Sequence, residues 1–177
     1  VRDLHMSGYP GPSMFASQPA LGDPSVAAGL VSATPTEIQF EGDVNGEGQV
    51  YSVDISYVSA DANDPNCPCV RRSATPKVQP FSASAPIAAT SYTEAAHLVP
   101  PGTAPGQSGQ NIFEFFDRLG NPVDLSTGND ITTPQGLQNL GAVAAIKINL
   151  TLTTGQRDPV SNQPVTVALS SLARPKQ

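Results

Sequence analysis

Residues 37–58 have the sequence EIQFEGDVNGEGQVYSVDISYV, in which two alternating apolar stretches flank a turn rich in Asp, Asn and Gly. Alternation at every second position is typical of a strand with one buried face. Asp43 to Gly48 supply what a tight connection needs, because Gly tolerates positive φ angles and Asp and Asn side chains bond to nearby backbone. The stretch therefore predicts a β-hairpin, with strands over residues 37–41 and 49–58.

Strand patterns continue downstream of this hairpin. Apolar residues again occupy alternate positions, and turn-forming residues separate the segments. Two short helical segments are also expected, over residues 92–98 and 132–141. The additional strands are predicted over residues 69–72, 111–117, 144–152 and 165–170.

The N-terminal residues predict the end of a helix followed by a long connection. Val1, Leu4 and His5 are at helical spacing within residues 1–7, and Gly and Pro follow at once. Residues 8–34 are rich in turn formers and show no lasting period. An antiparallel sheet must cover its apolar face, and the N-terminal helix is the expected cover. We therefore expect an α+β fold in which the end of an N-terminal helix packs on a strand-rich antiparallel β-sheet with long loops.

The length of 177 residues fits one domain with its own core. We therefore predict a single domain over residues 1–177, made of a helix end (1–7), a connecting loop (8–34) and a β-sheet domain (35–177). The chain begins without Met at a position that falls within the predicted helix, which indicates a truncated or processed form. It has no apolar run of the roughly 20 residues that a spanning helix needs, so an export signal and a membrane helix are expected upstream.

Composition limits the classes of partner. Nine basic and fifteen acidic residues give a net charge of −6, which repels polyanions, so nucleic acid is not an expected partner. The chain has 18 Pro and 15 Gly, a composition rich in turns. Its few lysines accompany many neutral polar residues, a surface common in extracytoplasmic proteins.

Several of these segments follow one another in a set order. They are Arg2-Asp3-Leu4 to Gly8-Tyr9, Ile38-Gln39-Phe40, Ile55-Ser56-Tyr57 after the Asp/Asn/Gly turn, Val70-Arg71, Phe113 to Gly120 and Ile146 to Leu150. Together they cover most of the chain, and their order resembles that of the minor pilins and minor pseudopilins of type IV pili and type II secretion systems, especially the W-type minor pilins. The diagnostic apolar helix and peptidase site of the family are absent, and Ala173-Arg174-Pro175 stands where Arg-Asn is usual.

The resemblance implies a non-enzymatic structural subunit of an extracytoplasmic filament. Such a subunit incorporates into, primes or caps the filament and contacts other pilin or pseudopilin subunits through its N-terminal helix. It is anchored in the inner membrane before assembly and then lies at the cell surface or in the periplasm. Whether the filament is a pilus, a pseudopilus or a DNA-uptake fibre, and whether the subunit is major or minor, stays open.

A second class is a secreted β-rich module that binds carbohydrate or a surface, with or without calcium. Exposed aromatic residues on a flat face would favour it, and the chain has no Trp and four Tyr. Asp43, Asn45, Glu47 and Gly48 fall at positions 1, 3, 5 and 6 of an EF-hand-like loop, with Asp54 at position 12. A hairpin turn explains the same residues without an ion. A weaker oxygen-rich candidate comprises Asp61, Asn63 and Asp64.

Other chemistry-bearing residues do not form a recognisable motif. Cys67 and Cys69 can pair in a small ring, pair between subunits or stay reduced, and we favour a disulfide. Their spacing to His5 and His97 does not fit a zinc site. The chain has no nucleophile elbow or phosphate-binding loop. Glu41 with Asp43 flanks the turn as solvated carboxylates, and Asn149 lies in a glycosylation-like triplet. We therefore assign no catalytic, cofactor or metal residue.

Overall fold

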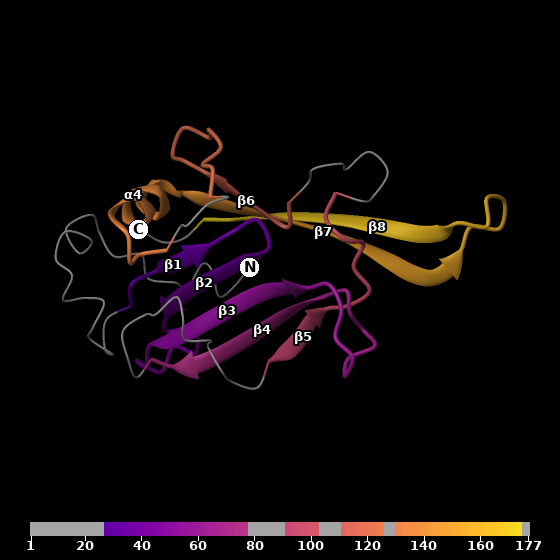
Figure 1. Ribbon diagram of the computed structural model, residues 1–177, viewed down its shortest axis with the longest axis horizontal. Coiled ribbons are helices and arrows are strands. Elements are labelled where there is room, and N and C mark those ends of the chain that lie inside the picture. Colours follow the sequence, from indigo (N-terminus) through magenta and orange to yellow (C-terminus); the bar gives the residue numbers. More distant parts are fainter. Residues whose placement is uncertain (1–26, 78–90, 103–110, 126–129, 175–177) are drawn as a thin grey trace.

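The computed structural model describes residues 27–77, 91–102, 111–125 and 130–174. Two antiparallel sheets lie one over the other, with a short helix at one end (Figure 1). The strand orders are β1-β2-β3-β4-β5 and β6-β7-β8. The strands are β1 (Leu30–Ala33), β2 (Glu37–Gly42), β3 (Tyr51–Val58), β4 (Cys69–Pro76), β5 (Tyr92–Ala95), β6 (Phe113–Phe116), β7 (Ala145–Arg157) and β8 (Pro164–Ala173).

The predicted hairpin is confirmed as β2 and β3. Ile38 lies opposite Ile55 and Phe40 opposite Val53, so the apolar positions of both strands share one face. Ile38, Phe40 and Val53 are fully buried on it. The alternating pattern of residues 37–58 therefore places one side of the five-stranded sheet in the core.

The strands predicted over 69–72, 111–117, 144–152 and 165–170 are also confirmed, as β4, β6, β7 and β8. The last two are longer than predicted, since β7 continues to Arg157 and β8 to Ala173. Beyond the four-residue β6, residues 97–99 pair with β7 as far as Thr153. Past Thr153 the ends of β7 and β8 form a two-stranded arm. Figure 1 shows this arm reaching beyond the five-stranded sheet.

The helical segment predicted over 132–141 is confirmed as α4 (Pro134–Ala142). Thr133 caps it, because its Oγ1 accepts the N–H of Gly136 at 3.0 Å. The helix predicted over 92–98 is wrong. Residues 92–95 form β5, because pairing with the edge of β4 supplies hydrogen bonds that a single helical turn would lack.

Strand β1 corrects part of the connecting loop predicted over 8–34. Residues 30–33 pair with β2, with an irregular register between Leu30 and Ser32. Leu30, Val31 and Ala33 are buried. The predicted helix end over residues 1–7, and residues 8–26 of the predicted loop, lie outside the described residues.

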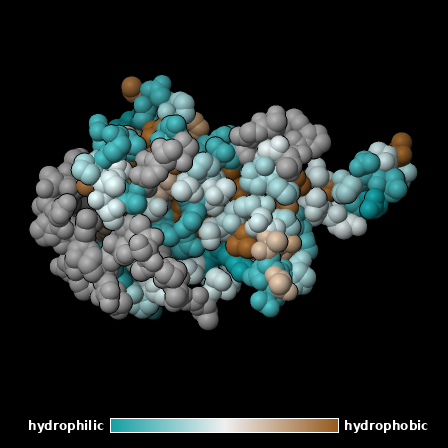
Figure 2. Space-filling model, in the orientation of Figure 1, coloured by the Kyte–Doolittle hydropathy of each residue, from teal (hydrophilic) through white to brown (hydrophobic). Residues whose placement is uncertain are grey.

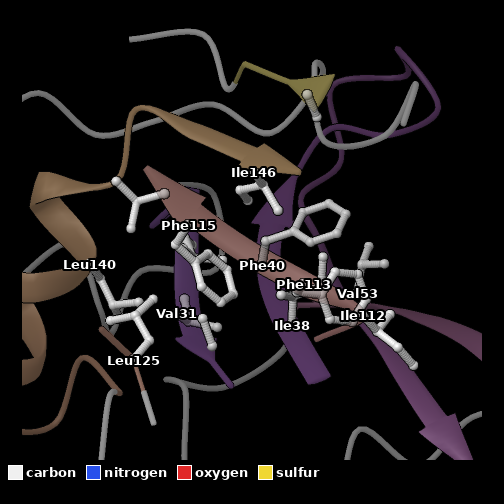
Figure 3. Close-up of a cluster of buried hydrophobic side chains, with 14 of the residues drawn as sticks. Val31, Ile38, Phe40, Val53, Ile112, Phe113, Phe115, Leu125, Leu140 and Ile146 are labelled. Atoms are coloured by element: carbon white, nitrogen blue, oxygen red, sulfur yellow. The ribbon is translucent and has the colours of Figure 1, made fainter. Parts of the chain in front are cut away.

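The predicted fold class is wrong for the described residues, because a second sheet covers the apolar face that was expected to need a helix. Both sheets direct their apolar positions into one core, in which Phe113, Phe115 and Ile146 meet Phe40 and Val53 (Figure 3). Two apolar sheet faces can cover each other. The architecture is therefore two stacked antiparallel sheets, with α4 at the margin.

No helix in the described ranges has both the length and the apolar character needed to span a bilayer.

Candidate functional site

An open apolar groove of about 320 Å³ lies between the two sheets. Strands β3, β4 and β5 form one wall, while β7, β8 and the residues around the start of β6 form the other. Pockets lined mainly by apolar side chains are the usual places for a partner or ligand to bind. The lining residues are Ile55, Val70, Arg72, Glu94, Ala95, Ile112, Phe113, Ile148, Leu150, Leu169, Ser170 and Ser171.

The groove opens because the five-stranded sheet covers only part of the β7–β8 hairpin. Ile146 at the base is fully buried. Leu150 is partly buried, and Leu169, which lies directly opposite it on β8, is 53% exposed. Val165 and Val167, farther out on the same face of β8, are exposed as well. The apolar row therefore runs from the core out into solvent.

The arm itself projects from the body of the molecule. Figure 2 shows it as a narrow extension with hydrophobic atoms at its tip. Val160, in the loop that joins β7 to β8, is 94% exposed. Exposed apolar groups on a projecting element are common at protein–protein contacts.

The rim of the groove carries one exposed aromatic side chain. Arg72 donates from Nη1 to Tyr92 Oη at 2.8 Å, and its guanidinium lies 5.6 Å from the centre of the tyrosine ring. Tyr92 is the only exposed aromatic among the large hydrophobic residues of the described ranges. The one exposed ring of the described ranges is therefore in contact with an arginine side chain.

Backbone hydrogen bonds to one carboxylate close the calcium-like turn. Asp43 accepts backbone N–H groups from Gly46, Glu47 and Gly48 at 2.7, 3.1 and 2.8 Å. These bonds, with the one from Gly48 strongest, hold the pKa of Asp43 below its ordinary value. Gly46 and Gly48 have φ angles of 75° and 78°, which explains glycine at both positions. The turn interpretation therefore accounts for these residues.

Asp54 does not join this turn. It lies opposite Gln39 in the middle of β3, on the face of the sheet that points away from the groove. Ser56 Oγ donates to its Oδ2 at 3.0 Å, whereas its Oδ1 is buried without a hydrogen-bond partner in the described part of the chain. Burial, with a smaller contribution from the nearby Glu37 carboxylate, raises the pKa of Asp54 to about 6.

The second oxygen-rich loop is an ion-pair cluster. Arg71 Nη2 lies 2.6 Å from Asp61 Oδ2 and 3.1 Å from Asp64 Oδ2. The N–H of Asn66 and the Arg71 guanidinium lower the pKa of Asp64 to about 2. Asn63 donates its N–H to Asp61. The carboxylates are thus occupied by donors of the protein itself.

The favoured disulfide between Cys67 and Cys69 is confirmed. With Asp64 these cysteines form the one group of three potential metal-ligand side chains in the described ranges. Both sulfurs are consumed by the disulfide, so they are not thiolate ligands. This group does not include His97, and His5 lies outside the described residues.

Three further candidates have structural roles. The N–H of His97 donates to Asn66, and its carbonyl accepts from Thr153. Asn149 is buried, donates to the Asn111 carbonyl and accepts from a β8 serine hydroxyl, so its amide is engaged inside the protein. Glu41 is not a solvated carboxylate as predicted but is fully buried.

Comparison of the chain with protein-family models, curated proteins and solved structures finds no match.

The groove was missed at the level of sequence. Val165, Val167 and Leu169 alternate with polar residues, which correctly predicted a strand with an apolar face. The same alternation arises whether that face is covered or open. The sequence does contain one signal that sets this segment apart. Residues 159–173 carry no charged side chain, whereas exposed edge strands usually carry some charged side chains.

Proposed function

We propose that the protein is a structural subunit of an extracytoplasmic filament of the type IV pilus or type II secretion pseudopilus kind. It acts by assembly, incorporating into, priming or capping the filament, and its partners are other subunits of that filament. Before assembly it is anchored in the inner membrane, and afterwards it lies at the cell surface or in the periplasm. It has no enzymatic role in this proposal.

The open groove between the sheets carries this proposal. Its walls place Val70, Ile148, Leu150 and the half-exposed Leu169 beside one another. Removing such apolar surface from water is favourable, by about 25 cal/mol per Å². A neighbouring subunit that covers the groove would gain this energy, which is a reason for the protein to work as part of an assembly.

The ordered pilin-like segments support the same proposal. Ile38-Gln39-Phe40 lies in β2, Val70-Arg71 in β4, the Phe113 block in β6 and Ile146 to Leu150 in β7. These segments provide much of the core and groove. The resemblance thus involves residues that shape the molecule.

The test is complementation of a deletion strain with wild-type or variant genes. Leu169→Asp places a charge in the groove, and Leu119→Asp makes the same change at an 87% exposed leucine outside both the groove and β8, as the matched control. We expect the deletion and Leu169→Asp to reduce surface filaments and the subunit content of sheared filaments, while Leu119→Asp retains both. Normal filaments, motility and secretion in the deletion strain, together with binding on a glycan array, would instead favour the carbohydrate-binding class.

A further inference from the structure

Strand β8 differs from every other sheet edge in the described residues. The edges β1, β5 and β6 are four residues long, and the first two pair through irregular registers. In contrast, β8 is a ten-residue edge strand without a charged residue, and nine of its residues are exposed. Natural proteins usually protect edges with short strands, bulges or charges, because unpaired backbone groups attract another strand.

The backbone groups that β8 presents to solvent follow from the ladder. Asn149 of β7 donates its N–H toward β6, to Ile112. In an antiparallel ladder neighbouring residues point to opposite sides, so Leu150 faces β8, where its partner is Leu169. The odd-numbered residues of β8 are therefore bonded to β7. The outward groups belong to Thr166, Ala168, Ser170 and Leu172.

We propose that β8 is a self-association edge, along which a second copy of this chain pairs antiparallel to form a continuous six-stranded sheet. The pairing is isologous, with each copy giving the same strand. It concerns the purified chain and requires no filament, so it stands or falls independently of the function proposed above.

The side-chain pattern selects a register for this pairing. Directly opposed residues of an antiparallel pair share a face, so the apolar row continues only if odd-numbered residues meet odd-numbered residues. Centring the pair on Leu169 places Val165 opposite Ala173 and Val167 opposite Ser171. The four outward residues of each strand then form about eight interchain backbone hydrogen bonds. A one-residue slip would set the apolar row against the polar face.

The absence of charge along β8 lets a second copy approach this edge. The whole chain carries a net charge of −6, so two copies repel each other over most surfaces. The span from Pro164 to Ala173 contains neither acidic nor basic side chains. Along this edge two copies approach without opposing like charges, and Leu169 meets its own counterpart.

The first experiment measures the mass of the purified protein by analytical ultracentrifugation from about 1 to 200 µM. We expect a monomer–dimer equilibrium with a dissociation constant on the order of 1–100 µM, typical of a modest interface. Ala168→Pro removes one outward N–H without touching the β7 ladder and should weaken dimerisation at least about tenfold. Ala168→Ser keeps that N–H and should dimerise like the wild type.

Hydrogen exchange of the wild type gives a second measurement that does not depend on the variant folding. The amides of residues 166, 168, 170 and 172 should exchange fast in dilute protein and slow in concentrated protein. A monomer at all concentrations would overturn the proposal. So would a dimer in which these four amides stay fast, or one that a folded Ala168→Pro variant forms with undiminished affinity.

Discussion

Lys77 Nζ lies 2.7 Å from Glu41 Oε2, and the two side chains are 0% and 1% exposed. The N–H of Ala28 donates to the same carboxylate oxygen at 2.9 Å. Strand alternation places Glu41 on the polar face of β2 with Gln39, away from the apolar core. The buried ion pair thus ties the residue after β4 to the end of β2 and to the residues before β1.

Replacing only one member of this ion pair should lower the free energy of unfolding far more than replacing both members. We expect Lys77→Met to lower the free energy of unfolding by about 3–5 kcal/mol, because it leaves a buried carboxylate without its cation. The double variant Glu41→Gln with Lys77→Met should recover most of that loss, since the amide still accepts from Ala28. Urea denaturation measures both.

The matched control is the Lys147–Glu114 pair, whose atoms are 2.9 Å apart but whose side chains are 36% and 30% exposed. Lys147→Met should change stability by about 0–1 kcal/mol, as for other solvated pairs. Equal losses of unfolding free energy for Lys77→Met and Lys147→Met would contradict the conclusion that the Lys77–Glu41 pair is buried.

Two glycines of α4 should respond oppositely to alanine. A Cβ at Gly136 would collide with the backbone carbonyl of Asp130, whereas one at Gly141 meets nothing within 4 Å. We expect Gly136→Ala to destabilise the protein by about 1–3 kcal/mol. Gly141→Ala should stabilise it by up to about 1 kcal/mol through helix propensity. Thermal melts of the two variants should shift in opposite directions.

Asp54 should make the protein more stable as the pH falls from about 6 toward 4. Its folded-state pKa is raised to about 6, chiefly by burial, so over this range the folded state holds a proton that the unfolded state has released. Asp54→Asn removes the charge and should stabilise the protein at pH 7 by about 1 kcal/mol, after allowance for solvent screening. The advantage should shrink toward pH 4.

Asp43→Asn is the control with the opposite sign. The backbone N–H groups of the turn lower the pKa of Asp43, so its contribution to stability is present at neutral pH and is lost in acid. This variant should therefore be less stable than the wild type at pH 7. Parallel pH profiles for the Asp43 and Asp54 variants would refute the assignment of the two environments.

Alanine substitutions along the apolar face of the β6-β7-β8 sheet should show where the five-stranded sheet stops covering that face, because only covered side chains contribute strongly to stability. Ile146 is fully buried and Leu169 is 53% exposed. We expect Ile146→Ala to cost about 2–5 kcal/mol and Leu169→Ala only about 0.5 kcal/mol. A large loss at Leu169 in dilute protein would mean that the groove is filled within the monomer.

The strands of this fold were predictable because their signal is local. Ile38 and Phe40 in β2, and Ile146 to Leu150 in β7, alternate over a few residues, and period two alone identifies a strand. Which element covers each apolar face is not encoded locally. Phe40 and Phe113 meet in one core although many residues separate them, and alternation is the same under a helix as under a sheet.

The errors at β5 and in the site have related causes. Tyr92 to Ala95 form a strand because β4 is beside them, which their own sequence does not encode. At the site, Asp43 and its glycines were correctly interpreted as a turn, since one side chain and its neighbouring amides are enough. The groove exists because β7 and β8 are longer than the sheet opposite them. This difference in length cannot be predicted from the sequence of any single segment.

The stacking of one sheet from residues 30–95 on another from residues 113–173 also sets an order of events during synthesis. The face that carries Ile38, Phe40 and Val53 leaves the ribosome before any strand that covers it has been made. Extending the chain from Val53 to Phe113, in the first strand of the covering sheet, takes on the order of 3–12 s at usual translation rates. Through that interval the nascent chain displays a bare apolar surface, so its yield in the cell should depend on chaperones that bind emerging polypeptides.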